Sequence, residues 1–155
     1  MANELPTIGA EPAPSTGRDE PLISVIIPHY NDLANLERCI RLLSEQTLPW
    51  ISFEIVVADN NSRCGLKVVE RVCGDVARVV PAPIHGAGAA RNLAVDASRG
   101  QILSFIDSDC RPTPNSLERG SVALSRAQIV GGQVNVDYAD PAEPTAVEAF
   151  ERVFA

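Results

Sequence analysis

Short apolar runs that alternate with helical segments constrain this chain more than any other feature. Five runs have the length and the β-branched content of strands that are buried in a sheet, and a segment with helix signals follows each of them. This β-α alternation predicts an α/β fold with a mostly parallel sheet and helices on both of its faces. The expected strands are residues 22–28, 53–59, 76–82, 101–107 and 127–137.

The segments between these strands differ in the strength of their helix signals. Residues 31–46 place four leucine and isoleucine side chains on one helical face, and Asn31 or Asp32 can cap the start. Gly100 is expected to end the third helix. A glycine pair at Gly131 and Gly132 suggests a bulge or a close backbone approach in the last strand. The expected helices are residues 31–46, 64–74 and 86–98, a fourth opened by Thr113 and Pro114 as N-cap and first residue, and a fifth that begins within 144–155.

Length and composition indicate one folded domain. The chain has 155 residues and is 45% hydrophobic, which is enough for a single core. Residues 1–20 are rich in Pro, Glu, Ala and Gly, and we expect them to form a disordered leader. The folded domain is therefore expected to cover residues 21–155.

The charge and the cysteines limit the class of protein. A net charge of −7 and a pI of about 4.8 disfavour sequence-independent binding to nucleic acid, which needs clustered Lys and Arg. Any phosphate must be bound locally, by backbone amides, single arginines or a metal ion. The four cysteines form no C-x-x-C motif, and the start has no apolar signal-peptide core. We expect reduced thiols, no membrane span and a cytoplasmic location, with association at the cytoplasmic membrane face left open.

Polar residues follow three of the expected strands, in "PHYN", "ADNNS" and "DSDC". Ligands of parallel α/β sheets bind beyond the carboxyl ends of the strands, so these residues can face one crevice. Asp107 and Asp109 repel each other unless they are protonated or bridged by a cation, and two carboxylates suit Mg²⁺ or Mn²⁺ shared with a substrate phosphate. The alternative is that Asp109 caps a turn and Asp107 is merely solvated.

Other strand-end residues allow two interpretations each. Asp59 can accept hydrogen bonds from a nucleobase or a ribose, or it can form an Asx-turn. Tyr30 and Asn31 can form a platform for a base, or a turn and a helix cap. In "HGAGAARN" the glycines let the backbone approach an anion at a helix start, and Arg91 can clamp a phosphate or lie on the surface.

The ordered set of motifs resembles a known family. "PLISVIIPHYND", "FEIVVADNNS", "GAGAARNLAVDASRGQILSFIDSD" and "VGGQV", in this order and spacing, are similar to the nucleotide-sugar-binding half of family 2 glycosyltransferases of the GT-A fold. The resemblance covers residues 21 to about 137. It implies an inverting transfer of a sugar from a nucleotide donor, with UDP the expected nucleotide, to a hydroxyl of an unknown carbohydrate or lipid-linked acceptor. It also implies a Mn²⁺ or Mg²⁺ cofactor.

The resemblance also implies roles for individual residues. Asp59 matches the carboxylate that recognises the base, and Arg91 matches an arginine near the phosphates. Asp107 matches the first aspartate of the family's D-x-D motif, near the ribose, and Asp109 matches its last, the metal ligand; both enter the expected metal site. The residues that match the first-strand motif lining the nucleotide pocket are Pro28, Tyr30 and Asn31.

One departure concerns the catalytic base. In the family this Asp or Glu lies well downstream, with the acceptor-binding half. The acidic residues after the expected fifth strand lie too early to match it: Asp137, Asp140, Glu143, Glu148 and Glu151. We therefore expect a GT-A domain that is incomplete at its C-terminus and carries the donor site, with no recognisable base and an activity that can be absent in the chain alone. The open sheet edge leaves self-association as a further expectation.

Two other enzyme classes and one non-enzymatic function remain as alternatives. A haloacid-dehalogenase-type phosphatase would use Asp107 as nucleophile, but that fold has its D-x-D on the first strand, and no lysine follows Lys67 here. A dinucleotide-binding domain would use Gly86-x-Gly88, but Arg91 stands in place of the third glycine. A catalytically inactive donor-binding fragment is the third alternative.

Overall fold

A four-stranded parallel sheet forms the centre of the molecule. The computed structural model describes residues 21–137, 140, 142–143 and 145–146. Within them the strand order is β3-β2-β1-β4, and neighbouring strands run parallel. The predicted α/β class with a mostly parallel sheet is thus confirmed. The strands are β1 (Ile23–His29), β2 (Phe53–Asp59), β3 (Arg78–Pro81) and β4 (Ile102–Phe105).

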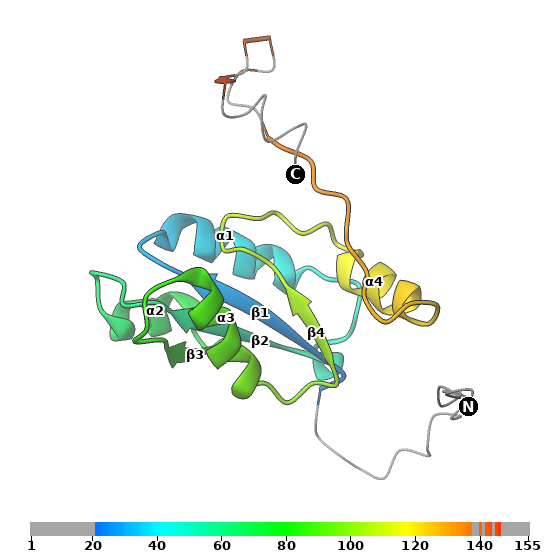
Figure 1. The fold of residues 1–155 in the computed structure, drawn as a ribbon, viewed down its shortest axis with the longest axis horizontal. Coiled ribbons are helices and arrows are strands. Elements are labelled where there is room, and N and C mark those ends of the chain that lie inside the picture. The colour runs from blue at the N-terminus through cyan, green and yellow to red at the C-terminus, as the bar shows by residue number, and fades with distance from the viewer. Residues whose placement is uncertain (1–20, 138–139, 141, 144, 147–155) are drawn as a thin grey trace, which may run out of the picture.

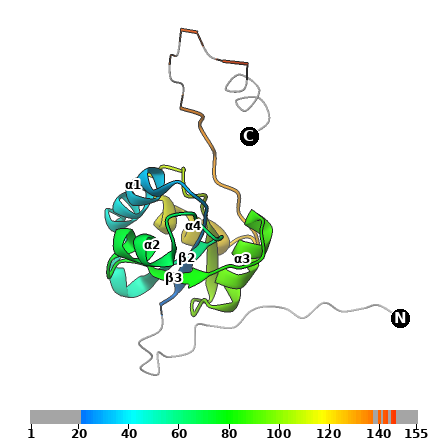
Figure 2. The ribbon, with the colours of Figure 1, turned by 90° about the vertical axis from the view of Figure 1, so that its left-hand side faces the viewer.

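Helices cover both faces of the sheet. Figures 1 and 2 show α1 and α2 on one face and α3 on the other. The fourth helix packs Leu117 into the same core cluster as side chains of α1 and α2. The helices are α1 (Leu33–Ser44), α2 (Leu66–Cys73), α3 (Ala87–Asp96) and α4 (Ser116–Leu124), with a short 3-10 helix, η1 (Trp50–Ser52), before β2.

The pleat of β1 and β2 divides the core in two. Alternate residues such as Ile27 and Val57 face α1 and α2, whereas Ile26 and Val56 face α3. All seven residues of each strand are buried, which is why apolar residues predominate on both faces of the two strands. Each fully buried Val or Ile contributes about 1.5–3 kcal/mol relative to an exposed one.

The helix boundaries test the capping predictions. Asp32 caps α1 as predicted, since its carboxylate accepts from the Asn35 backbone N–H at 3.2 Å. The prediction for α4 was wrong, because this helix begins at Ser116 and not at Pro114. Instead, the Thr113 carbonyl accepts from the Ser116 N–H at 3.0 Å and from the Gln46 side chain at 2.8 Å. These contacts hold a turn in front of the helix.

Gly100 does not cap α3, which ends at Asp96, four residues earlier. Its role is a close approach to β1. A Cβ at this position would lie 2.5 Å from the backbone nitrogen of Ser24. The Gly100 N–H donates to Ser24 Oγ at 2.8 Å. The glycine is therefore required by contact with the sheet and not by the helix end.

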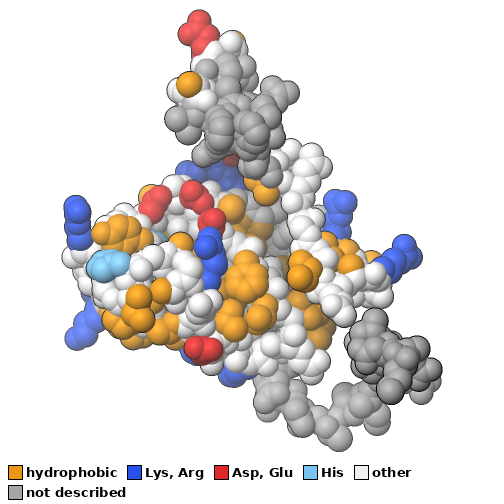
Figure 3. Space-filling model, viewed as in Figure 1, with side chains coloured by type: hydrophobic (Ala, Val, Ile, Leu, Met, Phe, Trp, Pro, Cys, Tyr) orange, Lys and Arg blue, Asp and Glu red, His pale blue; other side chains and the backbone are white. Residues whose placement is uncertain are grey.

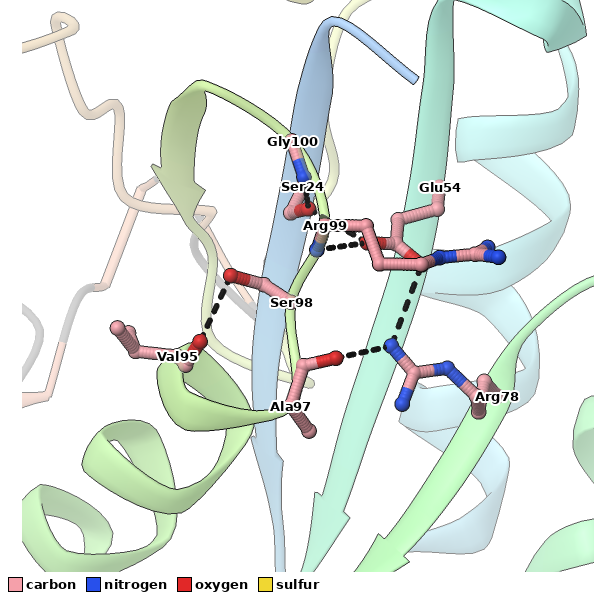
Figure 4. A network of polar contacts seen from close by, with 8 residues as sticks. All are labelled: Ser24, Glu54, Arg78, Val95, Ala97, Ser98, Arg99 and Gly100. Carbon is pink, nitrogen blue, oxygen red and sulfur yellow. Dashed lines mark hydrogen bonds and ion pairs between the residues drawn. The ribbon is translucent and has the colours of Figure 1, made fainter. Parts of the chain in front are cut away.

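A buried carboxylate fixes the turn between α3 and β4 (Figure 4). Glu54 Oε1 accepts from Ser24 Oγ at 2.7 Å and from the Arg99 backbone N–H at 2.6 Å. Its Oε2 accepts from Arg99 Nε at 3.0 Å and from Arg78 at 3.3 Å. Burial alone would raise the pKa of Glu54, but these hydrogen bonds outweigh it and the pKa is lowered. The carboxylate thus stays charged and joins β1, β2, β3 and the turn.

The predicted fifth strand is absent. Residues 127–137 form no strand, and Figure 1 shows this segment leading away from the sheet. Most of its apolar side chains are exposed, among them Ile129 and Val134, and nothing lies within 4 Å of a Cβ at Gly131 or Gly132, so neither glycine marks a close backbone approach. A strand needs cross-strand partners, and within the described residues β4 pairs only with β1.

Two predictions fall on other parts of the chain. The leader, residues 1–20, and most of the expected last helix, 144–155, lie outside the described residues. In the part that the structure describes, no helix has both the length and the apolar character needed to cross a membrane.

Candidate functional site

The carboxyl ends of the strands border an open pocket of about 520 Å³. Its walls come from the end of β1 and the segment after it, the residue after β2, the loop before α3 with the start of that helix, and the turn after β4. Five of the seven residues predicted from the sequence line it, and the other two, Asn31 and Asp59, do not. The five are Pro28, Tyr30, Arg91, Asp107 and Asp109.

Asp107 and Asp109 reach the pocket because the chain turns directly after β4. The Cys110 N–H donates to the Asp107 carbonyl at 3.0 Å, and the Cys39 thiol of α1 lies 3.9 Å from the same oxygen. Asp107 forms an ion pair with Arg91, and both side chains are partly exposed. Figure 3 shows acidic side chains beside a basic one on this part of the surface.

The start of α3 offers backbone donors to the pocket. Gly86 precedes the helix with φ 119°, and no side chain caps the helix. The first intrahelical bond runs from the Ala90 N–H to the Gly86 carbonyl, so the amides of residues 87–89 have no intrahelical acceptor. Together with Arg91, these amides make the α3 end of the pocket suited to an anion.

Asp59 is buried at the end of β2, next to the pocket residues His29 and Asn60. Its Oδ2 accepts from the Ser62 N–H at 3.3 Å, while its Oδ1 has no hydrogen-bond partner among the described residues. His29 is its direct neighbour in the sheet, and both of its ring nitrogens also lack a partner there. Burial lowers the pKa of His29 although Asp59 and Asp32 oppose this, so the imidazole is neutral at pH 7. Buried acceptors without partners are rare and call for a functional explanation.

Asn31 has a structural role. Its N–H donates to Ser62 Oγ at 2.9 Å, and its Oδ1 accepts from the Arg63 N–H at 2.8 Å. It adopts a left-handed conformation with φ 57°. Asn31 therefore ties the end of β1 to the loop after β2 and does not line the pocket.

The sequence did not single out several pocket residues. His85 meets Tyr30 edge to face, with ring centroids 6.5 Å apart. Asn60 uses its whole amide group to hold the loop in front of α3. The asparagines after Asp59 were visible in the sequence as turn formers, but their long-range partners were not. Gly86 also lines the pocket, as one of the glycines that we expected to let the backbone approach an anion. The remaining lining residues that were not predicted as site residues are His29, Asp32, Ala87 and Ser108.

The pocket residues suit a divalent cation that is shared with a ligand. Within the described residues, no group of three or more His, Cys, Asp or Glu side chains could hold a metal ion. Asp107 and Asp109 supply two carboxylates in one pocket. Mg²⁺ and Mn²⁺ sites commonly use one or two carboxylates and take their other oxygens from water and substrate phosphates. The residues present therefore fit such a cation.

Comparisons with known proteins support one family. The model for glycosyl transferase family 2 matches residues 24–152. The glycosyltransferase AglE of Haloferax volcanii is 36% identical over 137 residues, which cover 84% of this chain and 44% of AglE. The chain thus spans less than half of that relative's length.

Solved structures share the fold. TarS of S. aureus in complex with UDP-GlcNAc matches 76% of this chain and 38% of its own, with a TM-score of 0.60 and 24% identity. The mannosyltransferase PcManGT of Pyrobaculum calidifontis, in complex with GDP-Man and Mn²⁺, matches 71% of this chain and 34% of its own, with a TM-score of 0.63 and 26% identity. With the family model covering most of its residues, the chain belongs to glycosyl transferase family 2.

Proposed function

We propose that the pocket binds the nucleoside diphosphate of a nucleotide-sugar donor, with UDP as the preferred nucleotide. The observation that carries this proposal is the meeting of Asp107, Asp109, Arg91 and the uncapped start of α3 in one pocket. The two carboxylates suit a cation, whereas Arg91 and the amides at the start of α3 donate hydrogen bonds to an anion. A cation bound together with phosphates uses both sets of groups. Membership of the family supports the same class of ligand.

The phosphates and the metal would occupy the α3 and β4 sides of the pocket. Asp109 and Asp107 would hold Mn²⁺ or Mg²⁺, which when bound supplies positive charge to the leaving diphosphate. Arg91 and the α3 amides would bind diphosphate oxygens and stabilise the charge that grows as the sugar leaves. For Arg91 this requires sharing or releasing its ion pair with Asp107.

Asp59 would read the base. Its unpartnered Oδ1 is an acceptor, and uracil presents an N–H donor at its Watson–Crick edge. Guanine also carries such donors. The two solved neighbours were bound to donors with different bases, UDP-GlcNAc and GDP-Man, so the choice of base rests on Asp59 and its surroundings. Tyr30 and His85, at the mouth of the pocket, would contact the base or ribose.

The transfer itself would follow an inverting course. An acceptor hydroxyl, on a carbohydrate or a lipid-linked acceptor, would attack the anomeric carbon from the face opposite the diphosphate while a general base takes its proton. Asp32, a further carboxylate at the pocket, already caps α1. We therefore assign the base to no described residue, and a protein that binds donor without transferring sugar is the second candidate. The proposed location is the cytoplasm.

The alternatives place their motifs elsewhere in a sheet. A dinucleotide site would need its glycine loop after the first strand, whereas Gly86 follows β3. A haloacid-dehalogenase-type phosphatase would need its D-x-D after the first strand, whereas Asp107 follows β4.

Calorimetric titrations would test the proposed function. UDP and GDP, each with Mn²⁺, and NAD would be titrated into the 155-residue chain. We expect one UDP site, weaker binding of GDP and no binding of NAD. Binding of NAD, or no binding of either diphosphate, would contradict the proposal.

A further inference from the structure

We propose that Asn60 is a positioning residue that holds the loop before α3, and thereby the phosphate-binding start of that helix, in place before any ligand arrives. This inference rests on the proposed function for its consequence, but the hydrogen bonds behind it do not. Asn60 follows β2 directly, is 6% exposed and lies in the wall of the pocket.

The Asn60 side chain makes three hydrogen bonds to one loop. Its Nδ2 donates to the Ala82 carbonyl at 2.8 Å and to the Ile84 carbonyl at 2.6 Å. Its Oδ1 accepts from the Gly86 N–H at 2.8 Å. One amide group thus meets alternate residues of a five-residue segment, 82–86, which has no helix or strand of its own.

The backbone on either side of Asn60 anchors the arrangement. The Asn60 N–H donates to the His29 carbonyl at 2.8 Å, and the Ala82 N–H donates to the Asp59 carbonyl at 2.8 Å. Asn60 is therefore tied to β1 while the loop is tied to β2. Between Ala82 and Gly86, the two donors and one acceptor of the Asn60 side chain supply most of the hydrogen bonds that hold the loop.

Among side chains of this size, only asparagine supplies that combination. Aspartate has the same shape but, when ionised, accepts only. It would face the Ala82 and Ile84 carbonyls with a negative charge and leave both without their donor. Loss of a donor to a buried carbonyl is costly because the carbonyl has already lost its water.

The position of the loop decides what the pocket presents to phosphate. Gly86 is its last residue and the residue before α3, where φ 119° restricts the position to glycine. The free amides of residues 87–89 and Arg91 follow within the first turns. A loop that moves would therefore misplace the diphosphate donors, whereas Asp59 would keep its place in β2.

Asn60→Asp and Asn61→Asp form a matched pair of variants. Asn61 is the next residue, is exposed, and makes a single bond to the same loop, from Nδ2 to the Pro83 carbonyl at 3.0 Å. Both substitutions add one negative charge beside the loop. We expect Asn60→Asp to weaken UDP binding at pH 7 by about tenfold or more relative to Asn61→Asp. Uridine, which lacks the diphosphate, should bind both variants equally in an NMR titration.

A titration at lower pH distinguishes a specific loss of the Asn60 hydrogen bonds from a general disturbance of the fold by the substitution. Protonation lets the introduced carboxyl group at position 60 donate to one carbonyl again. Burial against the Ala82 and Ile84 carbonyls should raise the pKa of this carboxyl group above its ordinary value of about 3.9. The affinity of Asn60→Asp for UDP, measured relative to Asn61→Asp at each pH, should therefore recover as the pH falls from 7 to 4. Equal losses in the two variants, or a ratio that does not change with pH, would overturn the inference.

Amide hydrogen exchange on the unmodified chain tests the same inference without a substitution or a ligand. The Gly86 N–H should exchange slowly in the free protein because Asn60 Oδ1 holds it. Exchange at the rate of an unstructured peptide would overturn the inference even if UDP binds. Slow exchange together with no UDP binding would instead support the positioning role of Asn60 and contradict the proposed function.

Discussion

Asp107 and Asp109 are separated by a single residue, and they have different surroundings. Asp107 is paired with Arg91, whereas no ion pair is found for Asp109 among the described residues. This difference agrees with the proposed roles, in which both carboxylates bind the cation and Asp107 also lies beside the ribose and phosphates. Asp59 is different again, because it is buried and its Oδ1 accepts no hydrogen bond from any described residue.

Asp109→Ala and Asp59→Ala should therefore fail differently. Loss of Asp109 should weaken the binding of every nucleoside diphosphate in the presence of Mn²⁺. Loss of Asp59 should mainly remove the preference for UDP over GDP and ADP. Each change should cost about 1–3 kcal/mol of binding free energy, the scale of a lost hydrogen bond to a charged group. Calorimetry with the three nucleotides gives both profiles, and identical profiles would contradict this division of tasks.

The sequence could predict the site residues that lie at the ends of strands, but not those whose place depends on a loop. Pro28, Tyr30 and Asp107 lie at or just beyond the ends of apolar strands, so a parallel sheet brings them to one edge whatever the loops do. His85 and Asn60 depend on how the loop before α3 folds back onto β2. That path is set by hydrogen bonds between residues that lie 24 and 26 positions apart, which no local pattern displays.

At the scale of elements, the bounds of the buried strands were predicted more accurately than the bounds of the partly exposed strands. The predicted bounds of β1 are shifted by one residue, and those of β2 agree, because both strands are buried on both faces. β3 and β4 are four residues each and partly exposed, and both are shorter than predicted. Residues 127–137 have strand-like composition, but composition does not supply the partner that a strand needs.

Gly100→Ala tests the close approach between the α3–β4 turn and β1. A Cβ would collide with backbone, which cannot rotate away, so the free energy of unfolding should fall by about 1–3 kcal/mol. Gly88→Ala in α3 is the control, since nothing lies within 4 Å of its Cβ, and it should raise stability by about 0.5–1 kcal/mol. Urea denaturation measures both, and a neutral Gly100→Ala would contradict the packing.

Glu54→Gln tests the buried carboxylate at the amino ends of the strands. The folded-state pKa of Glu54 lies below its ordinary value of 4.5, so the folded protein binds this proton less readily than the unfolded chain. The stabilisation is therefore complete above about pH 4.5 and is lost as the pH falls through the folded-state pKa. At pH 7 Glu54→Gln should lower the free energy of unfolding by about 1–3 kcal/mol, and the difference from the unmodified protein should shrink in acid.

Glu45→Gln is the matched control for this experiment. Glu45 forms an exposed i,i+4 pair with Arg41 at 3.1 Å, and such pairs contribute about 0.3–0.5 kcal/mol. An equal effect of the two substitutions at pH 7 would show that the Glu54 network does not stabilise the fold.

At the scale of the whole molecule, hydrophobic side chains lie at the surface over β4 (Figure 3), where Leu103 and Phe105 are exposed.

The chain spans 44% of AglE, and we propose that sugar transfer needs a longer chain than the residues described. The 155-residue chain should bind donor but transfer little sugar. In the pocket of the described residues, Asp32 caps α1, and if Asp107 and Asp109 bind the donor as we propose, no pocket carboxylate is left for an acceptor proton. General-base catalysis contributes about 10²–10⁴-fold.

Release of UDP from UDP-sugars, measured with and without carbohydrate acceptors, checks this prediction. Slow release that no acceptor accelerates is expected, in a sample whose UDP binding is verified in parallel. Acceptor-dependent release would show that the base lies within this chain, with Asp32 and residues 137–151 the first candidates.

We propose a donor site in which a cation joins Asp107 and Asp109 to a diphosphate. Its most direct test is the dissociation constant of UDP for the 155-residue chain, measured by calorimetry in excess Mn²⁺ and again in excess chelator. We predict one site in Mn²⁺ and an affinity at least tenfold weaker in chelator, a loss of about 1.4 kcal/mol or more. The same affinity in both solutions would contradict the claim.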